Sequence, residues 1–165
     1  MGEAIITRRG GGASVNTVQR GTASMGGILT TDITIAEIDS GSSIIRIINP
    51  YSHSATVARL MFAGQIINDT TIRISRESSE ATNQNIEWEV TEYKNVKSKQ
   101  TGITTGNATI TSVDPSKSII LSSATSSLLS NTIVDLAFTY KINSATLVTN
   151  TGISKTHYWQ VIEFK

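Results

Sequence analysis

The side chains that most often bind metals or act as nucleophiles are scarce in this chain. It has no cysteine and only two histidines, His53 and His157, which lie in unrelated stretches of the sequence. A metal site usually needs three or four ligands at suitable spacing, and a general base needs a partner that orients it. We therefore expect no metal, no cofactor and no catalytic histidine.

Serines and glycines show no stronger catalytic pattern. No serine lies in a G-x-S-x-G elbow, and Gly10 to Gly12 lack the Lys-Ser/Thr ending of a phosphate-binding loop. Glu77 and Glu80 lie in a polar stretch that lacks the alternating oxygen ligands of a calcium loop. A solvated loop is the better interpretation of these two acids.

One pair of acids has a spacing found in glycosidases. Glu87 and Glu89 would project from one face of a strand, at a separation that a carboxyl pair could use. The corresponding positions in the second copy of the repeat described below are Tyr158 and Gln160, which argues against a shared catalytic role. The sequence therefore predicts a protein that is not an enzyme and has no catalytic residues.

Aromatic residues suggest binding and packing. Tyr51 and Tyr140 are candidate glycan contacts, because a ring face stacks on a sugar while the hydroxyl group takes hydrogen bonds. Trp88 and Trp159 each alternate with polar residues near the end of a copy of the repeat, as expected of a strand with one buried face. We predict that these two tryptophans are the core anchors.

The first 15 residues form a glycine-rich, basic arm. Ile5 and Ile6 are its apolar residues, followed by Arg8, Arg9 and the run Gly10, Gly11 and Gly12. Glycine tracts lose much backbone entropy when they are ordered, so a partner would have to hold them. Arginine beside glycine suits either nucleic acid or an acidic protein groove, and the neutral remainder of the chain favours the protein groove. We expect the arm to be the docking element.

Composition indicates a β protein. The 165 residues include 23 Ile and 9 Val but only 7 Leu, with 44 Ser plus Thr, and β-branched residues favour strands. The formal net charge is +1, which gives no overall attraction to nucleic acid or to a membrane. We expect neither partner, nor a signal peptide or membrane span, because no apolar run approaches the roughly 20 residues needed.

An internal repeat is the strongest pattern. TIAEIDSGSSII, from Thr34 to Ile45, and TITSVDPSKSII, from Thr109 to Ile120, are identical at six of twelve positions. VQRGTAS corresponds to KQTGITT, VARLMF to IVDLAF, INDTTIRI to INSATLVT with an offset of 75, and WEVTEYK to WQVIEFK. Two modules, residues 16–95 and 96–165, therefore follow the arm of residues 1–15.

Six short strands are predicted in the first copy, at residues 16–24, 32–38, 43–48, 56–63, 70–76 and 86–93, with counterparts in the second. Turns are expected at Asp39-Ser-Gly, at Asp114-Pro-Ser and at Asn68-Asp69, the first two closing hairpins. No window has the spacing of a helix, apart from one turn at residues 126–131. We predict an all-β fold of two tandem, sequence-related, jelly-roll-like β-sandwich modules.

The repeated Q-R-G-T, T-I-x-x-V/I-D and W-x-V-x-E-F/Y-K patterns resemble small virion structural proteins of tailed phages and prophages. That resemblance implies a protein of the capsid decoration, head-fibre or tail-fibre type, of which capsid decoration is favoured. We further expect a homo-oligomer, with a trimer favoured, that binds major capsid or tail proteins of the same virion after assembly in the bacterial host cytoplasm. The alternatives are a tail-fibre or tail-adaptor component and a carbohydrate-binding module for host adhesion.

Overall fold

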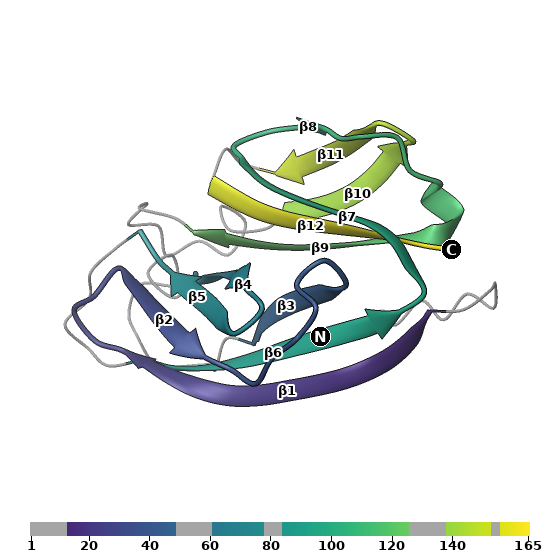
Figure 1. Ribbon diagram of the computed structural model, residues 1–165. Coiled ribbons are helices and arrows are strands. Elements are labelled where there is room, and N and C mark those ends of the chain that lie inside the picture. The colour runs from purple at the N-terminus through teal and green to yellow at the C-terminus, as the bar shows by residue number, and fades with distance from the viewer. Residues whose placement is uncertain (1–12, 49–60, 78–83, 126–137, 153–155) are drawn as a thin grey trace.

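The prediction of an all-β fold is confirmed. The computed structural model describes residues 13–48, 61–77, 84–125, 138–152 and 156–165, and these ranges contain twelve strands and one turn of 3-10 helix (Figure 1). All strand pairs are antiparallel. No helix within those ranges is long and apolar enough to cross a membrane.

The first half of the chain forms two three-stranded sheets. One sheet has the order β1-β6-β3, from strands Ser14–Met25, Gln84–Lys94 and Ser43–Ile48. The other has the order β2-β5-β4, from strands Thr30–Thr34, Thr71–Ser75 and Ala63–Asn68. Apolar side chains of both sheets share one core, so this half is a small β-sandwich.

The second half repeats this strand order. Its sheets are β7-β12-β9, from Val96–Thr104, Thr156–Phe164 and Ser118–Thr125, and β10-β11-β8, from Phe138–Ser144, Leu147–Gly152 and Ala108–Thr109. The 3-10 turn Pro115–Lys117 precedes β9. Each strand of the first half thus has a counterpart six strands later. As independent folding units, the modules 16–95 and 96–165 stay a prediction.

Both tryptophans lie in a core. Trp88 is 7% exposed and Trp159 is 8% exposed, each on the last strand of its half. Each indole lies against a glycine of the neighbouring edge strand in the same sheet, with Trp88 paired to Gly21 and Trp159 paired to Gly102. A Cβ atom on Gly21 would lie 2.5 Å from Cζ2 of Trp88, and one on Gly102 would lie 2.4 Å from Cζ2 of Trp159. The repeated glycine in the Q-R-G-T and K-Q-T-G segments therefore makes room for the indole.

Hydrogen bonds of side chains repeat as well. The amide of Gln19 donates to the carbonyl and accepts from the N–H of Ala36, and Gln100 does the same with Thr111. The acid near the end of each last strand binds the bulge in its neighbouring edge strand. Glu92 accepts from Asn16 and Thr17, and Glu163 accepts from Lys97 and Ser98.

The strand expected at residues 56–63 falls mostly within residues 49–60, which lie outside the described ranges, and the first described strand after them is β4, Ala63–Asn68. In the hairpin of β4 and β5, the two copies are offset by 76 residues and not by the predicted 75. Ile66 pairs with Ile72 in the first copy, and Ile142 pairs with Val148 in the second. Ile72 and Val148 are both fully buried, as expected of equivalent positions. An offset of 75 would not match these two residues with each other.

The two aspartate turns are present, but they do not close hairpins. Asp39 accepts from the N–H of Gly41, and Asp114 accepts from the N–H of Ser116. The strands on either side of each turn belong to different sheets, so each turn carries the chain across the sandwich. The hairpin in this region is β4–β5, at the predicted Asn68-Asp69 turn. The predicted helical turn at 126–131 lies outside the described residues.

Candidate functional site

The two halves meet at a buried junction. Asn95, with a positive φ of 59°, is the only residue between β6 and β7. Ile44 from the first half packs with Ile162 and Phe164 from the second, and the rings of Tyr93 and Phe164 meet edge to face with centroids 5.5 Å apart. In Figure 1 the sheet β7-β12-β9 lies over β3 and β4.

Gln160 makes the most specific contact of the junction. Its amide nitrogen donates to the carbonyl of Ile45 over 2.8 Å, and its oxygen accepts from the Ile45 N–H over 3.1 Å. Ile45 belongs to β3, an edge strand, so the glutamine satisfies the backbone groups that β3 would otherwise expose. On the neighbouring edge strand β4, the N–H of Gly64 donates to the hydroxyl of Ser123 over 3.3 Å.

The equivalent face of the first half has a charged row instead. Arg20, Glu89 and Arg46 lie side by side on β1, β6 and β3, with Arg20 2.6 Å and Arg46 3.7 Å from the Glu89 carboxylate. At the corresponding positions, the second half has Thr101, Gln160 and Leu121. Because the second half lacks these charges, the first half can cover the sheet β7-β12-β9 without burying charged side chains. As a result, β12 is largely buried on both faces, whereas exposed and buried residues alternate in most of β6.

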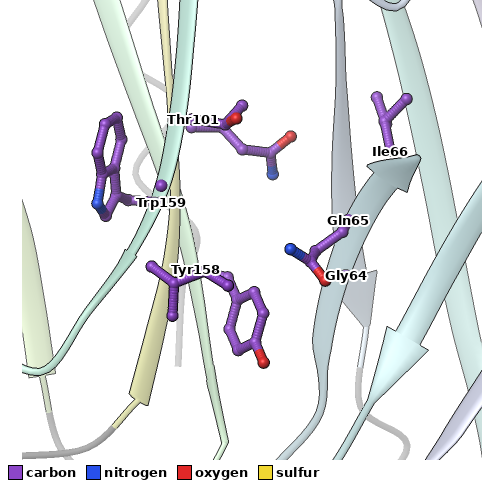
Figure 2. A pocket seen from close by; sticks show the side chains of 9 residues that line it. Gly64, Gln65, Ile66, Thr101, Tyr158 and Trp159 are labelled. Carbon is purple, nitrogen blue, oxygen red and sulfur yellow. The ribbon is translucent and has the colours of Figure 1, made fainter. Parts of the chain in front are cut away.

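A groove opens beside Gln160, between β4 of the first half and the sheet β7-β12-β9. Its volume is about 70 Å³. Figure 2 shows Tyr158 and Gln65 projecting toward one another from facing strands, while the Trp159 side chain points to the other side of its sheet. Polar groups of Thr101 and Gln160 and the partly exposed Ile103 complete the walls.

Chemically, this groove is suited to binding. Its lining contains amides, hydroxyl groups and apolar carbon but no carboxylate, histidine or lysine. Burial, and then the nearby charge of Glu77, raise the pKa of Tyr158, so its hydroxyl stays protonated and can donate a hydrogen bond. The volume is far below the roughly 300 Å³ of pockets that enclose a small molecule. The groove therefore suits one edge of a ligand, such as a polar face of a sugar.

An open depression of about 690 Å³ lies at another part of the junction, along residues 92–99 and the 39–42 turn. Lys99 projects from β7 and donates to the carbonyl of Ser40 over 2.7 Å. Burial lowers the pKa of Lys99 to about 8, although the charge of Asp39 acts in the opposite direction. The lysine thus ties the second half to the turn that precedes β3.

Several sequence-predicted site residues lie outside the described ranges. These are the docking residues Ile5, Ile6, Arg8, Arg9, Gly10, Gly11 and Gly12, together with Tyr51, His53 and Glu80. Tyr140 lies on β10, and its side chain is not among those described. The role of these two tyrosines as glycan contacts therefore stays a prediction.

The remaining candidate residues have structural contacts. His157 is fully buried on β12, where its counterpart in the first half is Ile86. Glu89 is held by two arginines, Glu87 is exposed, and Glu77 accepts a hydrogen bond from Thr125 over 2.6 Å. No group of three metal-ligating side chains occurs among the residues that the structure describes.

Sequence reasoning missed the residues of the junction, namely Gln65, Lys99, Tyr158 and Gln160. Three of these residues could have been noticed in the sequence, because the two copies have residues of different chemical type at these positions. Val18, Glu87 and Glu89 of the first copy correspond to Lys99, Tyr158 and Gln160 of the second. Comparison with known proteins adds no assignment, since no family model, no curated protein and no solved structure matches this chain.

Proposed function

We propose that this chain is a non-enzymatic structural protein on the surface of a tailed-phage virion, where it serves as a capsid decoration protein of the head. The observation that carries the structural role is the buried junction. Hydrogen bonds from Gln160 and Lys99 and the Ile44, Ile162 and Phe164 cluster join the two halves into one block. A fixed block of sheets suits a protein that must keep its shape within an assembly.

The chemistry of the described acids supports a structural role. Glu89 is paired with arginines, while Glu92 and Glu163 bind the bulges of β1 and β7. Hydrogen bonds from the Asp114 N–H and from Lys97 lower the pKa of Glu163, so it stays ionised and is a poor general acid. The groove offers no proton donor or acceptor of the kind that hydrolysis needs.

Attachment is assigned to the arm, residues 1–15. Ile5 and Ile6 can add to a strand edge, Gly10 to Gly12 allow close backbone approach, and Arg8 and Arg9 can bind carboxylates on a major capsid or tail protein. The protein would act as a homo-oligomer in the virion, after assembly in the bacterial host cytoplasm. Neither nucleic acid nor membrane is a proposed partner.

Deleting residues 1–12 tests this assignment. The truncated protein should unfold at the same temperature as the full chain and fail to join particles, since the arm contributes to attachment rather than to the described cores. Replacing Arg8 and Arg9 by alanine should weaken incorporation at low salt, and the difference from the parent should shrink at high salt, where the arginine contacts are screened. Labelling the protein in intact particles distinguishes head from tail. Full occupancy by the truncated protein would overturn the role of the arm.

A second candidate function, glycan binding for host adhesion, is favoured by the groove between the halves. Its amides and the Tyr158 hydroxyl match the hydrogen-bonding groups of a sugar. Binding on a glycan array should be lost in Tyr158→Ala and Gln65→Ala if the groove is the site. Loss in Tyr140→Ala alone would place the site elsewhere, and no binding by the parent protein would remove this candidate.

A further inference from the structure

Strand β1, Ser14–Met25, has an open edge. It is the longest of the described strands, at 12 residues, and it lies at the edge of the sheet β1-β6-β3. Val15 and Val18 are 51% and 39% exposed, although both are apolar. Edge strands are commonly protected by lysine, proline or a cover, because their unpaired backbone groups can pair with another chain.

The register shows which backbone groups of β1 face outward. The N–H and C=O of Ile45 bond to Gln160, so they point away from β6, and those of its partner Val90 must point toward β1. Val90 is opposite Gln19, whose backbone groups therefore face β6. It follows that the backbone groups of Val18, Arg20, Thr22 and Ser24 point out from the sheet. No hydrogen bond to them is found among the described residues.

The equivalent edge in the second half is protected. Its strand β7 is shorter, at 9 residues, and carries Lys97 and Lys99 where β1 has Asn16 and Val18. Lys97, whose side chain is 59% exposed, opposes pairing of this edge with another strand, whereas β1 contains neither lysine nor proline. The two copies of one fold thus differ at the feature that controls edge-to-edge association.

We infer that β1 is an oligomerisation edge, which pairs antiparallel with β1 of a second copy of this chain. Antiparallel pairing about a two-fold axis places β1 of one copy against β1 of the other, so the two strands have the same length. The outward-facing backbone N–H and C=O groups of both copies then bond to each other. The charges permit this contact, because Arg20 is the only charged residue of β1 and Glu89 lies 2.6 Å from it.

The pairing would extend an existing sheet. Each copy contributes the order β3-β6-β1, so two copies give one continuous sheet through both β1 strands. The bulge at Asn16 limits regular pairing to the stretch from Thr17 to Met25. A two-fold contact of this kind makes the dimer the basic unit, in place of the trimer that the sequence analysis favoured.

The test is sedimentation of the full chain over a range of concentrations. The parent protein should form dimers. Val18→Lys copies the residue found at the equivalent position of β7 and should weaken dimerisation several-fold, because it places a charged side chain on the apolar edge that the contact would cover. Thr22→Pro removes an outward N–H without removing a bond to β6, and it should weaken dimerisation by about tenfold or more.

Ile103→Pro is the matched control. Ile103 is the counterpart of Thr22 on β7, so this variant should dimerise like the parent. Hydrogen exchange locates the contact even if a proline variant fails to fold. The amides of Arg20 and Thr22 should exchange more slowly as the protein concentration rises, and those of Thr101 and Ile103 should not. A parent protein that is monomeric or trimeric, or a dimer that Val18→Lys leaves unchanged, would overturn the inference.

Discussion

Replacing Gln160 by glutamate tests whether the junction holds the two halves together. Gln160 is 5% exposed and satisfies both backbone groups of Ile45. A carboxylate can still accept from the Ile45 N–H, but it leaves the Ile45 carbonyl without a donor, which costs about 1 to 3 kcal/mol. It also buries a charge without a partner, and the combined loss should reach about 4 kcal/mol of unfolding free energy.

The repeat provides a matched control at the equivalent position. Glu89→Gln makes the reverse change on an open face, where the Arg20 side chain is 67% exposed. This ion pair is screened by solvent, so the control should lose at most about 1 kcal/mol. Gln160→Glu and Glu89→Gln are nearly isosteric exchanges at corresponding positions. The losses of unfolding free energy that they cause should nevertheless differ several-fold.

Urea unfolding followed by circular dichroism measures both variants. The defect of Gln160→Glu should shrink near pH 4, where a carboxyl group is largely protonated and can donate to the Ile45 carbonyl. Folding then favours the protonated form, so the stability of this variant falls as the pH rises. Equal and small losses for the two variants at pH 7 would refute a buried, closely fitted junction.

Five further substitutions probe the cores and the lysine at the junction. Trp88→Ala and Trp159→Ala should each cost about 3 to 5 kcal/mol of stability, and thermal melting near that of the parent would show that the indoles do not anchor the cores. Gly21→Ala should cost about 1 to 3 kcal/mol because its Cβ meets the indole of Trp88, whereas Gly106→Ala, with open space around it, should be neutral or slightly stabilising. Lys99→Met removes a lysine whose pKa falls to about 8 from 10.5 on folding. Between those values the folded state binds fewer protons than the unfolded state, so the parent should gain up to roughly 3 kcal/mol over the variant as the pH rises through that interval; a loss would contradict the burial of Lys99.

The sequence was sufficient to predict the class of the fold, and local chemistry explains why. The β-branched composition predicted strands, the aspartates at 39 and 114 predicted turns, and the W-x-V-x-E pattern marked the last strand of each half. Most of β4 was missed because Ala63–Asn68 looks less strand-like than the apolar run that precedes it. Apolar alternation does not tell a strand from the segment that leads into it.

The candidate site could not be predicted because it depends on contacts between residues far apart in the chain. Gln160 and Ile45 are 115 residues apart, and nothing near either one indicates that they meet. The differences between copies, at Glu89 and Gln160 above all, mark the face that becomes buried. They do not identify what covers it, since that depends on the geometry of the turn at Asn95.

Burial of β12 on both faces limits how this duplicated architecture can be changed. Repeated domains are often exchangeable, so that copies can be added, removed or reordered during evolution. Here a chimera with two first halves would place Glu89 and its arginines against the edge of β3, where Gln160 now lies. A second half expressed alone would expose Ile162 and Phe164 to water. We therefore expect the two halves to be replaceable only as a pair, since the residues of each copy suit different neighbours.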